Sequence, residues 1–145
     1  MLSVIIIYAP ENQSAINSIN TLKTAFETEE CEINVKSAAS AIIPDMTAAD
    51  IIILGSMPKG KMPVHPDFKE ITRALQGINL AGKTAGIFTF ESINTINAFR
   101  EILHDSHITI CDEGFFINKE NNNSFTKADW VKKIISLHKE RSIHE

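Results

Sequence analysis

The run from Pro10 to Ser14 carries groups that could bind an anion. It follows an apolar stretch and precedes an amphipathic one, so its backbone N–H groups would open a helix, where the helix dipole favours negative charge. The side chains of Asn12, Gln13 and Ser14 add donors. Pro10 lacks an N–H group, and Glu11 would repel each negative charge by about 1 kcal/mol at about 5 Å in water-like surroundings. The run has no glycine, so the alternative is an ordinary turn that caps a helix through Asn12 or Ser14.

A second run, from Ser56 to Val64, could hold a flat ring. Gly55, just before this run, and Gly60 within it permit close approach of the backbone to a planar group, and the sulfur of Met57 or Met62 would give such a group a polarizable surface. Lys59 and Lys61 would stabilise negative charge on it. The alternative is a surface loop rich in proline and glycine, with two solvated lysines. The candidate binding residues here are Ser56, Met57, Pro58, Lys59 and Gly60.

A third run, from Thr89 to Asn94, offers one aromatic ring. Phe90 could stack on a planar ligand, while Thr89, Glu91 and the nearby Ser92 could bond the edge of that ligand. The alternative for Phe90 is a buried aromatic at the end of a strand. The candidate binding residues in this run are Thr89, Phe90 and Glu91.

The elements that position these runs follow from hydrophobic periodicity. Continuous apolar, β-branched stretches are typical of parallel strands buried on both faces, and apolar residues at every third or fourth position predict helices. Strands are predicted at 4–8, 31–35, 51–55, 84–90 and 108–110, and 115–117 could continue the last. Helices are predicted within 16–26, 68–75, 93–103 and 130–137, with a capping box at 126–129 and at most a short helix between 37 and 50.

This alternation of strands and helices implies right-handed crossovers and a parallel sheet. The predicted fold class is α/β: a three-layer, doubly wound sandwich around a five-stranded parallel sheet of order 2-1-3-4-5. Ligands of such sheets bind at the carboxyl ends of the strands near the switch point. The three runs are therefore expected to meet at that edge.

Composition bounds the possible classes of protein. The chain has 145 residues, 43% of them hydrophobic and 22% charged, with a net charge of −4. We expect one domain over residues 1–138 and a polar tail over 139–145. No clustered basic face points to nucleic acid, and no apolar run is long enough for a signal peptide or a membrane span, so a cytoplasmic location is expected. The sequence does not indicate an oligomeric state.

The cysteines and histidines give no catalytic or metal-binding pattern. Cys31 and Cys111 fall on opposite edge strands of the predicted sheet, whereas disulfide-bonded Cα atoms lie within about 7 Å, so two free thiols are expected. His104 and His107 have no third ligand nearby in the sequence, which favours surface histidines.

Between residues 50 and 88 the sequence carries a family resemblance. The residues are DIIILGS at 50–56, Gly60, PDFKE at 66–70 and LAGKTAGIF at 80–88. This pattern resembles the short-chain flavodoxins, and the likeness extends over nearly the whole chain. It matches the family's third strand, flavin-side loop, following helix and entry to the fourth strand. No insertion interrupts the predicted fifth strand, which is similar to the short-chain branch.

The resemblance implies an FMN cofactor at the three runs, electron transfer, and a redox partner protein. FMN phosphate would lie at the first run, and the flavin ring would lie between the second and third runs. Two features depart from the family: its T-x-T-G-x-T phosphate pattern is replaced by Ala9–Ala15, and the third run is shorter. Lys59 and Lys61 stand where the family tends to be acidic, so they would raise the reduction potential of a bound flavin.

Two hypotheses follow. The chain is an FMN-binding electron carrier with a degenerate cofactor site, or it is a flavodoxin-like binding or regulatory module that no longer binds flavin. An enzyme acting on a phosphorylated small molecule at the same edge is a third, weaker alternative, because no catalytic residues are evident.

Overall fold

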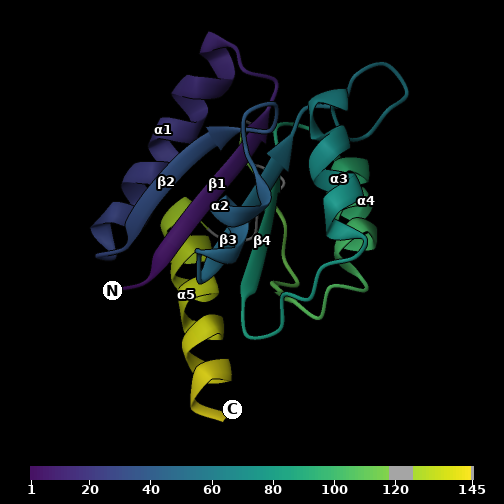
Figure 1. Cartoon of the computed structure of the whole chain (residues 1–145). Helices are drawn as coiled ribbons and strands as arrows, with labels where there is room; N and C mark the ends of the chain where they lie inside the picture. The colour runs from purple at the N-terminus through teal and green to yellow at the C-terminus, as the bar shows by residue number, and fades with distance from the viewer. Residues whose placement is uncertain (118–125, 145) are drawn as a thin grey trace.

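The computed structural model describes residues 1–117 and 126–144, with side chains up to residue 140. Its sheet is parallel and has the strand order β2-β1-β3-β4-β5, with helices on both faces (Figure 1). The predicted fold class and strand order are therefore confirmed. The strands are β1 (Ser3–Ala9), β2 (Glu32–Ser37), β3 (Ile51–Ser56), β4 (Thr84–Thr89) and β5 (Thr109–Ile110), and β6 (Phe115–Phe116) also pairs with β4.

The helices form the outer layers. They are α1 (Gln13–Thr28), α2 (Ile43–Thr47), α3 (Lys69–Leu75), α4 (Ile93–Leu103) and α5 (Lys127–His144), with a 3₁₀ turn, η1 (Pro66–Phe68), before α3. Helix α5 continues through the segment predicted as a polar tail. His138, the last residue before that segment, is buried, and its Nδ1 lies 3.0 Å from the hydroxyl of Thr84. No helix within the described ranges is long and apolar enough to cross a bilayer.

Strand β1 is apolar throughout because it lies between two cores. Its side chains alternate, so Val4, Ile6 and Tyr8 pack in the cluster that holds α1 and α5, while Ile5 and Ile7 pack in the cluster under α2, α3 and α4. Each fully buried aliphatic side chain contributes about 1.5–3 kcal/mol relative to its exposed state. The two cores therefore fix which residues face each layer of helices.

Gly86, in the middle of β4, lets α5 approach the sheet closely. A Cβ at this position would lie 2.5 Å from Cδ1 of Ile134 and 2.9 Å from Cδ1 of Ile53. Backbone conformation does not require the glycine, since Gly86 has no positive φ. The glycine is required because the side chains of Ile134 and Ile53 occupy the space that a Cβ would need.

The fifth strand forms in the two segments that the sequence indicated, β5 and β6, and both pair with β4. Two residues separate Ala85 from Phe88 on β4, whereas four separate their partners Ile110 and Phe115. The two extra residues form a detour that neighbouring helices hold. Arg100 of α4 donates to the carbonyl of Asp112, and Trp130 Nε1 of α5 donates to the carbonyl of Glu113 at 2.8 Å.

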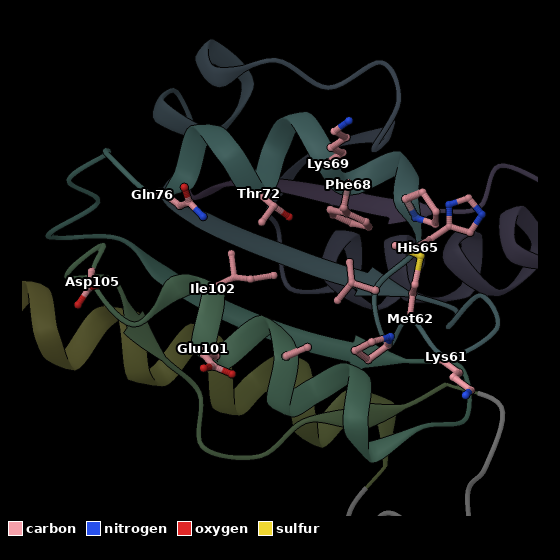
Figure 2. A pocket seen from close by; sticks show the side chains of 14 residues that line it. Lys61, Met62, His65, Phe68, Lys69, Thr72, Gln76, Glu101, Ile102 and Asp105 are labelled. Atoms are coloured by element: carbon pink, nitrogen blue, oxygen red, sulfur yellow. The ribbon is translucent and has the colours of Figure 1, made fainter.

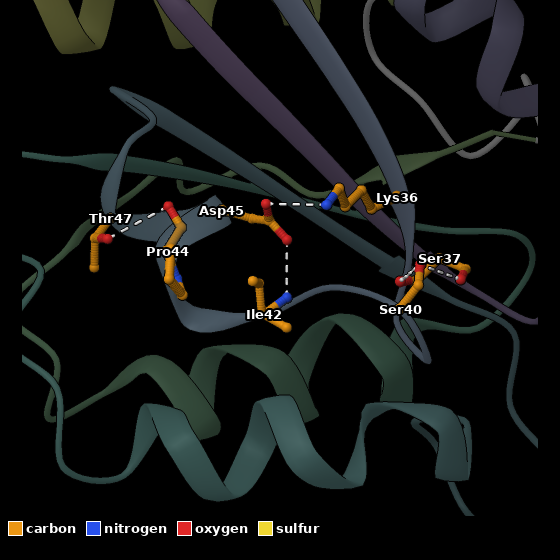
Figure 3. A network of polar contacts seen from close by, with 7 residues as sticks. All are labelled: Lys36, Ser37, Ser40, Ile42, Pro44, Asp45 and Thr47. Carbon is orange, nitrogen blue, oxygen red and sulfur yellow. Dashed lines mark hydrogen bonds and ion pairs between the residues drawn. The ribbon is translucent and has the colours of Figure 1, made fainter.

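Strand β2 runs two residues beyond its predicted end, into a polar network that anchors α2 (Figure 3). Asp45 accepts from the N–H of Ile42 at 2.8 Å and forms an ion pair with Lys36 at 3.2 Å. The backbone hydrogen bond from Ile42, and then the interaction with Lys36, lowers the pKa of Asp45. The contacts fix the β2–α2 connection on the face that also carries α3 and α4.

Both cysteines are buried free thiols, as predicted. Cys31 immediately precedes β2 and Cys111 immediately follows β5, on opposite sides of the sheet order. Burial raises the pKa of both thiols. Because the thiolate is the nucleophilic form, neither cysteine is set up for reactivity.

Candidate functional site

The three candidate loops begin at the same level of the sheet. Ala9 of β1 pairs with Ser56 of β3, and Ser56 pairs with Thr89 of β4. The loops that follow these strands therefore share the carboxyl edge, as the sequence predicted. Two of them, 10–12 and 90–92, contain only three residues before the next helix.

The β1–α1 loop uses its polar groups on its own helix. Asn12 is the N-cap of α1, and its Oδ1 accepts from the N–H of Ala15 at 2.8 Å. The Gln13 amide donates to Oδ1 of Asn17 at 2.9 Å. Ser14 is exposed, so its hydroxyl is left as a side-chain donor at this helix start. The side chain of Asn12 therefore takes an N–H group that an anion at the helix N-terminus would need.

The Glu11 carboxylate places a negative charge near this end of β1. Pro10 follows Ala9 through a cis peptide bond, and Glu11 is exposed. Burial, and then the charge of Glu11, raises the pKa of the Tyr8 hydroxyl. The Glu11 carboxylate disfavours the ionised form of that hydroxyl, and it would also repel an anion placed beside it.

The β3–η1 loop is the long loop of this edge, and its base is pinned. Ser56 is buried, and its hydroxyl donates to the carbonyl of Met57 and accepts from the N–H of His65, both at 2.8 Å. The hydroxyl of Thr95, in α4, donates to the carbonyl of Pro63 at 2.6 Å. The loop is therefore tied both to its own strand and to α4.

The tip of this loop is a tight turn that projects two lysines. Lys59 and Met62 exchange two backbone hydrogen bonds of 2.9 Å, and Gly60 supplies the positive φ of 58° at the first central position. Pro58, Lys59, Gly60 and Lys61 are exposed. Met57 packs partly buried against the core under α1, whereas Met62 is 50% exposed.

The β4–α4 loop keeps its aromatic ring inside the protein. Phe90 is 1% exposed and packs edge-to-face on Phe88, with ring centroids 5.8 Å apart. The buried hydroxyl of Thr89 accepts from the N–H of Ser92 at 3.2 Å, and Ser92 caps α4. Phe90 is thus a core ring at a strand end, and Glu91 is the exposed member of the predicted set.

A planar ring does approach Gly55, but it belongs to the protein. A Cβ on Gly55 would fall 2.1 Å from the ring atoms of Phe88 on the adjacent strand. Sequence reasoning interpreted this glycine as permitting the close approach of a ligand. In the structure, the glycine accommodates a side chain of the neighbouring strand.

A cavity near these loops lies beside the carboxyl edge, between α3 and α4 (Figure 2). Its volume is about 940 Å³, within the range of ligand-binding clefts. The loop residues 61–66 close one end. Sequence reasoning missed the residues of α3 and α4 that line it, because no local pattern shows that Thr72 and Ala98 face each other across two helices.

His65 connects the long loop to this cavity. It lines the cavity, and its Nδ1 accepts from the N–H of Asp67 at 3.1 Å, which caps η1. The ring is therefore held as a structural cap at the mouth of the cavity.

Comparisons with known proteins agree on the architecture. The chain superposes on a short-chain flavodoxin associated with a non-canonical PDU bacterial microcompartment with a TM-score of 0.80, covering 95% of this chain and 99% of that one at 14% identity. This chain has the flavodoxin-like fold. Oxidised flavodoxin 2 from Bacillus cereus gives a TM-score of 0.71 at 19% identity, with 99% of each chain covered.

A Fusobacterium nucleatum flavodoxin bound to flavin mononucleotide gives a TM-score of 0.70 at 15% identity. The superposition covers 97% of the present chain and 99% of the Fusobacterium protein. No protein-family model and no curated protein sequence matches the chain. At these identities the likeness concerns the fold, and function must be argued from the site.

Proposed function

We propose that this flavodoxin-like chain is a partner-binding module that does not hold FMN. The observation that carries the proposal is the three-residue β1–α1 turn, in which Asn12 Oδ1 accepts the N–H of Ala15 at 2.8 Å. A phosphate at this helix start would have to displace that cap. It would also lie near Glu11, whose negative charge would repel it.

The other two loops support the same conclusion. A flavin ring at this edge would need apolar surface on both of its faces, but Phe90 is 1% exposed and Met57 packs against the core. The hydroxyls of Ser56 and Thr89 are buried and bonded within the protein. The residues present therefore do not fit FMN without rearrangement of both short loops.

The test is reconstitution with FMN. The purified chain is incubated with excess FMN, desalted and examined for flavin absorbance, with the Fusobacterium nucleatum flavodoxin as a positive control. We expect no retained flavin and no rise in Tm with FMN concentration, because a ligand that binds the folded state must stabilise it. Retention of about one FMN per chain, with a concentration-dependent rise in Tm, would overturn the proposal.

An FMN-binding electron carrier is the second candidate. It is supported by the fold's likeness to an FMN-bound flavodoxin and by the exposed tip that presents Lys59, Gly60 and Lys61. FMN supplies one- and two-electron redox chemistry when bound. A redox partner protein would then be required, and the reconstitution experiment separates the two candidates directly.

A further inference from the structure

The groove between α3 and α4 exists because two small side chains face it. On the α3 side, the lining residues are Lys69 and Thr72 of the helix and Gln76 at its C-cap, spaced three and four apart along one face. On the α4 side, the lining residues are Ala98, Glu101, Ile102 and Asp105, spaced in the same way. Thr72 and Ala98 do not fill the space between the two helices, so a hollow remains along it. We call this feature the α3–α4 groove.

The floor of the α3–α4 groove is apolar and fixed. Phe68 is 1% exposed and packs edge-to-face on Phe99, with ring centroids 5.0 Å apart. Val64 and Ile102 pack partly buried against the same core. A ligand would therefore meet a preformed apolar surface, which lowers the entropic cost of binding.

The charges of the groove are separated along its length. Lys61 lies at the loop end, and Lys69 lies on the wall formed by the first turn of α3 (Figure 2). Glu101 and Asp105 lie toward the opposite end. Within the described part of the chain, Lys61, Lys69 and Glu101 form no ion pair, and Asp105 pairs with the exposed His104. These charges are available to an occupant of the groove.

The dimensions suit a short helix. Gln76 lies seven positions after Lys69, which corresponds to about 10 Å along a helix axis, and Asp105, just past the end of α4, lies seven positions after Ala98. A volume of about 940 Å³ exceeds that of one or two buried side chains and admits the apolar stripe of two to three helical turns. The half-exposed Met62 at the rim provides an adaptable apolar contact.

We propose that the α3–α4 groove binds an amphipathic helical segment of a partner protein. The segment places apolar residues at spacings of three and four on the floor, carboxylates near Lys61 and Lys69, and basic residues near Glu101 and Asp105. This inference rests on the proposed function, since it identifies the partner of a binding module. Of the three loops at the carboxyl edge, it involves only the β3–η1 loop, through residues 61–66.

The test uses a phage-displayed library of random peptides of about 16 residues, long enough for about four helical turns. Selection on the wild-type chain is followed by counter-selection on A98W, which fills the hollow from the partly exposed α4 wall. Circular dichroism and Tm establish that A98W is folded. If it is not, T72W fills the same hollow from α3.

We expect the enriched peptides to carry an apolar stripe with acidic residues at one end and basic residues at the other. Their affinity, measured by fluorescence anisotropy, should fall at least about tenfold for A98W, equivalent to about 1.4 kcal/mol. Selection on K61E/K69E should favour peptides that are basic at both ends. This reversal tests the charge pattern separately from the apolar floor.

Three results would overturn the inference. The first is that A98W weakens the binding of no enriched peptide. The second is that the peptides whose binding A98W weakens lack the charge pattern, and the third is that the wild-type chain forms a dimer in sedimentation that A98W abolishes, which would make a second copy the occupant. FMN retention and peptide binding are separate measurements, so failure of the proposed function is distinguishable from failure of this inference.

Discussion

Replacing Asn12 by alanine tests the feature on which the proposed function depends. The carboxamide of Asn12 satisfies the N–H of Ala15 at 2.8 Å, and loss of an N-cap typically costs about 1 kcal/mol, within a range of about 0.5–2. For a chain of 145 residues this corresponds to a fall in Tm of about 3 to 4 °C. Helix α1 packs Ile19, Leu22 and Phe26 into the core, so the loss should register in global unfolding.

Guanidinium denaturation followed by the fluorescence of Trp130 is a suitable assay, because this buried residue is the one tryptophan of the chain. The midpoint for N12A should fall with an unchanged m value. N12D keeps an oxygen at the cap and should stay within about 0.5 kcal/mol of the wild type. S14A is the matched control for a neighbouring exposed hydroxyl and should also stay within about 0.5 kcal/mol.

Equal losses of stability in N12A and N12D would refute the reasoning, because aspartate keeps the oxygen that accepts from the N–H of Ala15 and alanine does not. A larger loss in S14A than in N12A would make Ser14 the residue that satisfies the helix start. Neither N12A nor N12D should retain FMN, because Glu11 and the three-residue loop are unchanged.

Two further predictions concern packing and pH. G86A should lower the free energy of unfolding by about 1–3 kcal/mol in chemical denaturation, because a Cβ there lies 2.5 Å from Ile134 Cδ1. The control is G77A, where a Cβ meets nothing within 4 Å, and it should change stability by less than about 0.5 kcal/mol. Similar losses in both variants would contradict the packing argument. D45N should lower stability at pH 7 by about 1 kcal/mol through the cap of α2. Because the pKa of Asp45 is lowered in the folded state, its contribution is complete above the unfolded value of about 4 and is lost as pH falls through the folded value. The difference between D45N and the wild type should therefore shrink below about pH 4, and a difference that grows there would refute the assignment.

Much of the scaffold was predictable because its signals are local or repeat along the chain. The runs at 51–54 and 84–89 form strands because they are buried on both faces, and the capping box at Thr126 and Asp129 forms as the sequence indicates. Right-handed crossovers allow the order 2-1-3-4-5, which is the order that the sheet has. Local patterning also left a choice between Asn12 and Ser14 as the cap of α1, and the path of the chain after β1 selects Asn12.

The candidate site was less predictable because it depends on contacts between distant residues. Nothing local tells whether Phe90 turns toward a ligand or into the core, since that depends on Phe88 and the helices above it. The detour before β6 arises because Arg100 and Trp130, from two different helices, bond carbonyls of the same short segment. The α3–α4 groove likewise requires Thr72 and Ala98 to face each other across a space set by two helices.

The amino-acid sequence by itself determined the class of the sheet, the order of its strands and the edge at which the loops gather, because hydrophobic period and connection length act along the chain. Tertiary structure alone decided that Asn12 occupies the helix start, that Phe88 fills the space beside Gly55, and that a charged groove opens between α3 and α4. These outcomes depend on which side chains from separate elements compete for the same space or the same N–H group, and that competition exists only once the layers have packed.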